Sequence, residues 1–222
     1  MSGRVEVTAA GLLFDNDGVI VSSIASVNRC WRKWAAHYGV PDADKVEIAH
    51  GTRAVEIMQT LKPGVDEAEG LRLIEDMEIE DVADLEVLPG VRALLESLPA
   101  DRWAIVSSAT WRLLVGRLKA AALPVPERII SGDRVVQGKP HPEPYIKGAA
   151  LIYAAPRDCI VIEDAPTGAM AGKAAGCRVL GVLGTHSAQE LREAGADWVV
   201  RSLEDVRATA VEGGLRVVFE GV

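Results

Sequence analysis

Short apolar runs and longer stretches of helical periodicity alternate along most of the chain. The runs are bounded by glycine or polar residues, which is typical of buried parallel strands joined by crossover helices. The pattern predicts strands at residues 11–14, 103–106, 159–162, 178–183 and 198–200. It predicts helices at residues 91–98, 111–122, 144–154, 168–175 and 188–194. We therefore predict an α/β fold with a doubly wound parallel sheet that is covered by helices on both faces.

Residues 22–86 interrupt this alternation. They contain helical patterns at residues 24–38, 54–61 and 67–84, and no run that predicts a strand. The chain then returns to the sheet through a proline and a glycine, in Val87-Leu88-Pro89-Gly90. We predict a helical cap at residues 22–86, inserted into a core of residues 1–21 and 87–222. A cap placed directly after the first strand would stand over the carboxyl ends of the sheet, where open α/β folds bind ligands, and would act as a lid.

Composition argues against several kinds of partner. The chain has 222 residues, 49% of them hydrophobic, and a formal net charge of -8. It is long and apolar enough to bury a sizeable core, and its charge repels nucleic acid and anionic membranes. No stretch reaches the ~18 uninterrupted apolar residues of a membrane span. The three cysteines, an odd number within apolar stretches, are typical of reduced thiols, so we expect a cytoplasmic protein without nucleic-acid or membrane partners.

Two acidic pairs follow predicted strands. Asp15 and Asp17 come directly after the first strand, and Glu163 and Asp164 follow the strand at residues 159–162. The carboxyl ends of parallel strands face one crevice, so the four carboxylates would meet there. Each pair alone also fits a simpler role, the first as a turn and the second as a helix N-cap. Together they predict a divalent cation with oxygen ligands, for which Mg²⁺ is the usual choice where phosphate completes the shell.

Two further features predict a phosphate site. Ser107 and Ser108 follow the strand at residues 103–106 and precede a helix, where a hydroxyl and free backbone N–H groups stabilise an anion. Lys139 lies in a loop with three prolines, at residues 137–144, which would hold its ammonium with little freedom. The simpler interpretations are that the serines cap a helix and that Lys139 is a surface lysine. The order of Ser107 and Lys139 along the chain, between the two acidic pairs, favours phosphate chemistry.

Taken in chain order, these motifs resemble those of one known group, the haloacid dehalogenase-like superfamily. Its four motifs match Asp15-Asn16-Asp17-Gly18-Val19, Ser107, Lys139 and Glu163-Asp164. The resemblance covers essentially the whole chain, including an insert where this superfamily carries a small helical cap. Residues 50–53, 137–147 and 163–177 resemble the glycerol-3-phosphate and 2-deoxyglucose-6-phosphate phosphatases. The resemblance implies a Rossmann-like core and hydrolysis of a small phosphorylated sugar or polyol.

The same resemblance implies a role for each motif residue. Asp15 would attack phosphorus and form an aspartyl-phosphate, and Asp17 would protonate the leaving alkoxide and then activate water. Ser107 would bind a phosphoryl oxygen, with Ser108 beside it, and Lys139 would neutralise both the phosphate and the nucleophile. Such roles make physical sense, because a covalent intermediate splits one difficult step into two and phosphoryl transfer depends on charge neutralisation.

The resemblance also implies how Mg²⁺ would be held. The ligands would be the carboxylate of Asp15, the backbone carbonyl of Asp17 and the carboxylate of Asp164, with Glu163 reaching the ion through water. The resemblance also implies that two cap residues, His50 and Arg53, contact the substrate. Each of these two also fits a simpler role, His50 in a loop and Arg53 as a solvated arginine at a helix start.

Two other functions share these motifs. A phosphosugar mutase of the same superfamily would use the same core residues and pass the phosphoryl group from Asp15 to a second sugar hydroxyl. A non-catalytic phosphate-binding module would keep the fold without turnover. The presence of both Asp15 and Asp17 and the likeness of the segments around Lys139 and Glu163 to phosphatases favour hydrolysis. The sequence leaves open which phosphorylated metabolite is the substrate, the oligomeric state and the role of residues 214–222.

Overall fold

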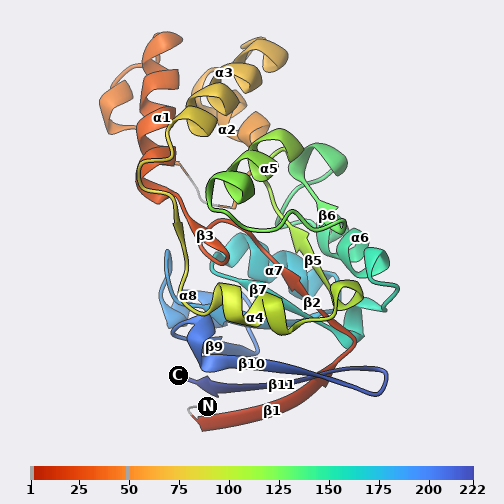
Figure 1. The fold of residues 1–222 in the computed structure, drawn as a ribbon. Coiled ribbons are helices and arrows are strands. Elements are labelled where there is room, and N and C mark those ends of the chain that lie inside the picture. Colours follow the sequence, from red (N-terminus) through yellow and green to blue (C-terminus); the bar gives the residue numbers. More distant parts are fainter. Residues whose placement is uncertain (1–2, 49–50) are drawn as a thin grey trace.

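A six-stranded parallel sheet forms the centre of the molecule (Figure 1), as seen in a computed structural model that describes residues 3–48 and 51–222. The strands lie in the order β6-β5-β2-β7-β8-β9, and each neighbouring pair runs parallel. Their bounds are β2 (Gly11–Phe14), β5 (Trp103–Val106), β6 (Ile129–Ile130), β7 (Cys159–Glu163), β8 (Arg178–Val182) and β9 (Trp198–Val200). This order confirms the predicted α/β fold. β6 was not predicted, because a two-residue strand is too short to show a pattern.

Helices cover both faces of this sheet. On one face lie α4 (Val91–Ser97) and α5 (Trp111–Ala120), and on the other lie α6 (Glu143–Leu151) and α7 (Pro166–Ala174) with α8 (Ala188–Glu193) beside α7. Successive strand residues point to opposite faces, so Leu12 and Phe14 pack with the first pair while Leu13 packs with α6 and α7. The five helices begin or end within a few residues of the predicted positions.

The segment between β3 (Val21–Ser22) and β4 (Glu86–Val87) is helical. These two short strands pair antiparallel where the chain leaves and re-enters the core, and the sequence pattern did not predict them. The helices α1 (Ile24–His37), α2 (Ala54–Leu61) and α3 (Glu67–Glu80) stand at the end of the molecule opposite the chain termini (Figure 1). We call this segment the cap.

The cap has a hydrophobic core of its own. Trp31 and Trp34 pack against each other with ring centroids 5.5 Å apart, and Met58 and Ile74 are buried in the same cluster. α3 ends at Glu80, four residues before the predicted end. After this end the chain turns, and Asp81 and Asp84 both accept from Arg29 Nη2 at 2.7 Å.

A three-stranded antiparallel sheet covers the end of the core below α4 (Figure 1). It has the order β1-β11-β10, with β1 (Gly3–Ala9), β10 (Val206–Val211) and β11 (Gly214–Gly221). Alternate residues of β11, Leu215, Val217 and Phe219, are buried in the same cluster as α4. Residues 214–222, whose role the sequence left open, therefore close the hydrophobic core on that side.

The remaining connections contain single turns of 3-10 helix, at Ala43–Lys45, Ala100–Arg102, Gly132–Arg134, Pro156–Asp158 and Leu203–Asp205. Within residues 3–48 and 51–222, no helix combines the length and apolar character needed to cross a membrane.

Candidate active site

The carboxyl ends of three adjacent strands bring the predicted motifs together. β2 lies between β5 and β7, and all three run parallel. Asp15 follows β2, Ser107 follows β5, and β7 ends at Glu163 with Asp164 next in the chain. Because these strands end at the same edge, residues that are far apart in the sequence meet in one place.

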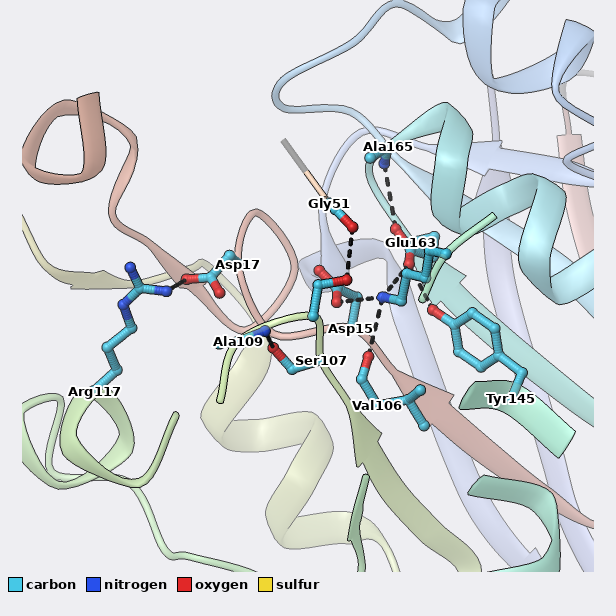
Figure 2. Close-up of polar contacts among 12 residues, drawn as sticks. Asp15, Asp17, Gly51, Val106, Ser107, Ala109, Arg117, Tyr145, Glu163 and Ala165 are labelled. Atoms are coloured by element: carbon cyan, nitrogen blue, oxygen red, sulfur yellow. Dashed lines mark hydrogen bonds and ion pairs between the residues drawn. The ribbon is translucent and has the colours of Figure 1, made fainter. Parts of the chain in front are cut away.

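Lys139 is at the centre of the buried charges at this edge. Its Nζ donates to Asp15 Oδ1 at 2.6 Å, to Glu163 Oε1 at 2.6 Å and to the Val106 carbonyl oxygen at 3.0 Å. Burial alone would lower the pKa of Lys139, but the two carboxylates raise it above its ordinary value, so the ammonium stays charged. Tyr145 on α6 donates its hydroxyl to the same Glu163 oxygen at 2.5 Å, which holds that carboxylate in place (Figure 2).

Three buried carboxylates beside this lysine form a group that suits a hard divalent cation. Oxygen atoms of Asp15, Glu163 and Asp164 lie within 4.8 Å of one another. Three negative charges face the one positive charge of Lys139, so the group has two negative charges in excess. Burial raises the pKa of Asp15 well above its ordinary value, and burial with the Glu163 charge raises that of Asp164 to about 7. Mg²⁺ fits this group, because it takes carboxylate oxygens as ligands and would neutralise the excess charge.

The position of Asp164 is fixed by the turn after β2 and by the loop after β8. Gly18 in that turn has a φ of +86°, and a Cβ at this position would overlap the Asp164 carboxylate. Thr185 donates its hydroxyl to Asp164 Oδ2 at 2.5 Å. Glycine at position 18 therefore lets the turn approach the carboxylate closely, and any larger side chain there would displace it.

Magnesium is expected to stabilise the protein more strongly as the pH rises. The pKa of Asp164 is about 7 in the folded state, whereas that of an unfolded aspartate is about 4. Between about pH 4 and about pH 7 the folded state therefore holds a proton that the unfolded state has lost. The metal-free protein should therefore lose stability as the pH rises from about 4 to about 7. Mg²⁺ binds the ionised carboxylate, so its stabilising effect should grow over the same window. Thermal unfolding with Mg²⁺ and with EDTA, across this pH range, would measure both effects.

Asp164→Asn is the matched variant for this experiment. It removes the titrating group and one negative charge, so the Mg²⁺-dependent rise in Tm should shrink and lose most of its pH dependence. If Mg²⁺ shifted the Tm of both proteins equally at every pH, the carboxylate group would not be a metal site.

Asp17 points away from the buried carboxylates. Its Oδ1 accepts hydrogen bonds from Arg117 Nη1 at 2.7 Å and from Ser23 Oγ at 3.0 Å. Figure 2 shows Asp17 turned toward Arg117, on the side away from Glu163. The sequence pattern predicted that all four carboxylates would meet, but the turn after β2 directs those of Asp15 and Asp17 to different cationic partners. Asp17 is 32% exposed and lies at the boundary between core and cap.

The two predicted phosphate-binding serines have different surroundings. Ser107 Oγ accepts a hydrogen bond from the backbone N–H of Ala109 at 3.1 Å, which leaves its own O–H proton free to donate to a phosphoryl oxygen. Ser108 donates its hydroxyl to the carbonyl oxygen of Gly51 in the cap at 2.6 Å. A phosphate contact through the Ser108 hydroxyl would have to replace this bond between core and cap. The phosphate-binding roles of both serines stay predictions.

Arg53, the residue before α2, joins the cap to the core. Its Nε and Nη2 donate to Glu56 Oε1 at 2.9 and 2.5 Å, and its Nη1 donates to the carbonyl oxygens of Val135 and Val136 at 3.3 and 3.2 Å. The side chain is 16% exposed, so Arg53 is not a freely solvated arginine. Its contact with substrate stays a prediction, and His50, the other predicted cap contact, lies outside the described residues.

A cavity of about 90 Å³ lies between cap and core beside Asp17. Its walls include the apolar cap residues Trp31, Ile57 and Ile74. Gly18 and Thr185, which contact Asp164, also line it, so the cavity adjoins the carboxylate group. A leaving group attached to a phosphate at Asp15 would extend into this space.

Arg117 and its cap partner Glu78 were not among the site residues predicted from the sequence. Arg117 Nη2 donates to Glu78 Oε2 at 2.7 Å, and both side chains are 6% exposed. A signal for each was present, because Arg117 shares the apolar stripe of α5 with Leu114 and Leu118, and Glu78 lies one turn after Ile74 on α3. A charged residue on the apolar side of a helix needs a buried partner, and only the folded chain shows which one.

Most of the chain matches one known protein family. Residues 12–182 fit the model of a family described as haloacid dehalogenase-like hydrolase. The chain belongs to this family. The match confirms the family that the four motifs predicted, and it runs from β2 to β8, including the cap and all of the predicted catalytic residues.

Two similar proteins are phosphatases by name. The chain is 36% identical over 209 residues to hexitol phosphatase A of Escherichia coli, a match that covers 92% of this chain and 96% of that one. It is 32% identical over 207 residues to glycerol-1-phosphate phosphohydrolase 1 of Saccharomyces cerevisiae, which covers 88% and 83% of the two chains. Both matches include the core and the cap.

One solved structure with this fold contains phosphate. It is a haloacid dehalogenase family hydrolase from Deinococcus radiodurans with bound phosphate and sodium, 27% identical to this chain with a TM-score of 0.65. The match covers 88% of this chain and 92% of that one. The similarity therefore extends to cap and core together.

Proposed function

We propose that the protein is a magnesium-dependent phosphatase that hydrolyses a small phosphorylated sugar or polyol through an aspartyl-phosphate on Asp15. Membership of the hydrolase family and the two similar phosphatases support a phosphoric monoester hydrolase. The observation that carries the proposal is the buried contact of Lys139 with Asp15 and Glu163, each at 2.6 Å, beside Asp164. A positively charged group held in a fixed position among carboxylates neutralises negative charge where it would develop, and phosphoryl transfer depends on such neutralisation.

Asp15 is placed to act as the nucleophile. Its side chain is 7% exposed and is held through Oδ1 by Lys139. Burial raises the pKa of Asp15, and the Lys139 charge opposes this rise and so favours the ionised nucleophile. Mg²⁺ held by Asp15, Asp164 and the backbone carbonyl of Asp17 would supply Lewis-acid neutralisation of the phosphate, with Glu163 nearby. The Ser107 hydroxyl, whose proton is free, would donate to a phosphoryl oxygen from the β5 side.

Asp17 is placed to act as acid and base for the leaving group. It lies at the mouth of the cavity in which the leaving alcohol would sit, two residues after the nucleophile. In the first step it would donate a proton to the alkoxide oxygen, and in the second it would take a proton from the attacking water. The Ser23 hydroxyl and the Arg117 guanidinium, at 3.0 and 2.7 Å, hold its Oδ1 and leave Oδ2 for the proton.

Asp17→Asn is expected to lower kcat by roughly 10²- to 10³-fold, within the range that a positioned acid or base contributes. An amide of the same shape keeps the hydrogen bond from Arg117, so inorganic phosphate should still bind as a competitive ligand. Steady-state kinetics and isothermal titration with phosphate would measure the two properties separately. A kcat within a factor of about three of the wild type would remove Asp17 from the acid–base role.

The substrate class follows from the two similar phosphatases and the cavity. Their names specify hexitol and glycerol phosphate esters, and the cavity between cap and core has polar groups that can bind hydroxyls. We therefore expect a small polyol or sugar monophosphate, such as glycerol phosphate or a deoxyhexose 6-phosphate.

Phosphate release from a panel of phosphorylated metabolites tests the proposal directly. The full chain with Mg²⁺ should release phosphate from one or more small polyol or sugar monophosphates, and EDTA should stop the release. Activity that survives EDTA would contradict the metal-dependent mechanism. Absence of release from every ester, including a generic aryl phosphate, would support the non-catalytic phosphate-binding module.

A further inference from the structure

The ionisable side chains that line the cavity are mostly acidic. α3 of the cap contributes Glu75 and Glu78, and the core contributes Asp17 and Arg117. Among the described residues that line the cavity, these four are the only ionisable ones. The balance is three carboxylates to one guanidinium, in a space whose other walls are largely apolar. Burial raises the pKa of Glu78 to about 7, so its negative charge is fully present only above that pH.

The guanidinium is already engaged on both sides. Arg117 donates from Nη1 to Asp17 and from Nη2 to Glu78, each at 2.7 Å, and its side chain is 6% exposed. Burial would lower the pKa of Arg117, but Asp17 and Glu78 raise it, so the charge is retained and used within the protein. Arg117 therefore offers little attraction to a further anion.

The third carboxylate, Glu75, is held in place from two directions. Its Oε1 accepts a hydrogen bond from the Thr110 hydroxyl and its Oε2 lies 3.2 Å from Arg112 Nη1. Arg112 is half exposed, also pairs with Asp76, and is not part of the cavity wall. Arg112 is thus shared by two carboxylates, Glu75 and Asp76, so negative charge stays in excess around the cavity.

We propose that this cavity selects leaving groups that carry hydroxyls and no negative charge, with Glu75 and Glu78 as the residues that determine the selection. The inference rests on the proposed function and specifies the substrate of the same site. Carboxylate oxygens accept hydrogen bonds from polyol hydroxyls. A carboxylate or second phosphate on the leaving group would instead meet three carboxylates and a guanidinium that is already paired, and like charges placed together suppress binding.

The same charge balance favours a phosphatase over a mutase. In a mutase, the aspartyl-phosphate would be attacked by a hydroxyl of a sugar phosphate, so a sugar that already carries one phosphate must enter the leaving-group cavity. That phosphate would lie among Asp17, Glu75 and Glu78. Water meets no such repulsion, so hydrolysis of the phosphoryl-Asp15 bond is the favoured second step.

Two pairs of esters, each with one member neutral and one anionic in its leaving group, test the selection. Glycerol 3-phosphate and 3-phosphoglycerate differ only in a CH₂OH or COO⁻ group, as do glucitol 6-phosphate and 6-phosphogluconate. In the pair that the wild type hydrolyses faster, its kcat/KM for the neutral ester should exceed that for the anionic ester by about tenfold or more. Equal kcat/KM values, or a preference for the anionic member, would overturn the inference while leaving the phosphatase in place. If neither neutral ester is hydrolysed, the proposed polyol or sugar substrate fails instead.

Glu78→Gln tests which residue sets the preference. The amide keeps the shape and still bonds hydroxyls, but it frees one side of Arg117, so the neutral-to-anionic ratio of kcat/KM should fall by about fivefold. Glu80→Gln, the same change at an exposed position of α3, should leave the ratio unchanged. Glu75→Gln should lower the ratio in the same direction and provides the test if Glu78→Gln does not fold. If Glu75→Gln and Glu78→Gln both fold and neither changes the ratio, these glutamates do not set the preference for neutral leaving groups.

Discussion

Replacing Asp15 with asparagine is expected to lower kcat by about 10⁵-fold or more, the scale of loss seen when an enzyme's nucleophile is removed. The amide cannot form the aspartyl-phosphate, and water cannot take its place because Asp15 is buried against Lys139 at 2.6 Å. Steady-state phosphate release would measure the loss. Acid-quenched protein analysed by peptide mass spectrometry should show a phosphorylated peptide containing residue 15 in the wild type and none in the variant.

The variant should remain folded, which separates a chemical loss from a structural one. Burial and the neighbouring carboxylates raise the pKa of Asp15, so asparagine removes a repulsive charge in the metal-free protein. Lys139 keeps its contacts with Glu163 and Val106. The Tm in EDTA at about pH 8 should therefore be equal to or higher than that of the wild type. Asp101→Asn, at an exposed position, is the matched control with full activity. A variant that retained even a tenth of the wild-type kcat would exclude Asp15 as nucleophile.

The sheet and the nucleophile's position were predictable from sequence for a physical reason. Buried parallel strands are short apolar runs, and their carboxyl ends lie at one edge, so the residues after β2, β5 and β7 had to be neighbours. Lys139 was assigned to the same site from its proline-rich loop and its place in the order of the motifs, and not from the end of a strand. Its loop has no periodic pattern, and its contacts with Asp15 and Glu163 depend on how the chain before α6 returns to the sheet.

The contacts between cap and core were not predictable from the same patterns. Each helix of the cap shows its apolar side in the sequence, but the relative placement of α3 and α5 arises from packing that no local pattern encodes. The Glu78–Arg117 pair is therefore visible only in the structure. The same holds for the bond between Ser108 and Gly51. The sequence predicted the residues that would act on phosphorus, whereas the surroundings of the leaving group required the fold.

Lys139→Met is expected to reduce both stability and activity. Methionine fills a similar volume but leaves Asp15, Glu163 and Asp164 without their cation in a buried site. Removing one partner of a buried ion pair costs about 3–5 kcal/mol of unfolding free energy. kcat/KM should fall by at least about 10²- to 10³-fold, the effect of removing one preorganised charge donor. Urea unfolding and phosphate-release kinetics would measure the two losses.

The pH dependence and the effect of Mg²⁺ distinguish this loss from a simple packing defect. Without the ammonium, the pKa values of Asp15 and Asp164 in the folded state should rise further above their unfolded values. The folded state then binds more protons, so the destabilisation should grow as the pH increases from about 5 to about 8. Mg²⁺ should restore a larger part of the stability in Lys139→Met than in the wild type, because it neutralises the same carboxylates, but it should not restore the rate. Lys119→Met, at an exposed position on α5, is the matched control. A destabilisation that was independent of both pH and Mg²⁺ would mean that Lys139 contributes packing and not charge.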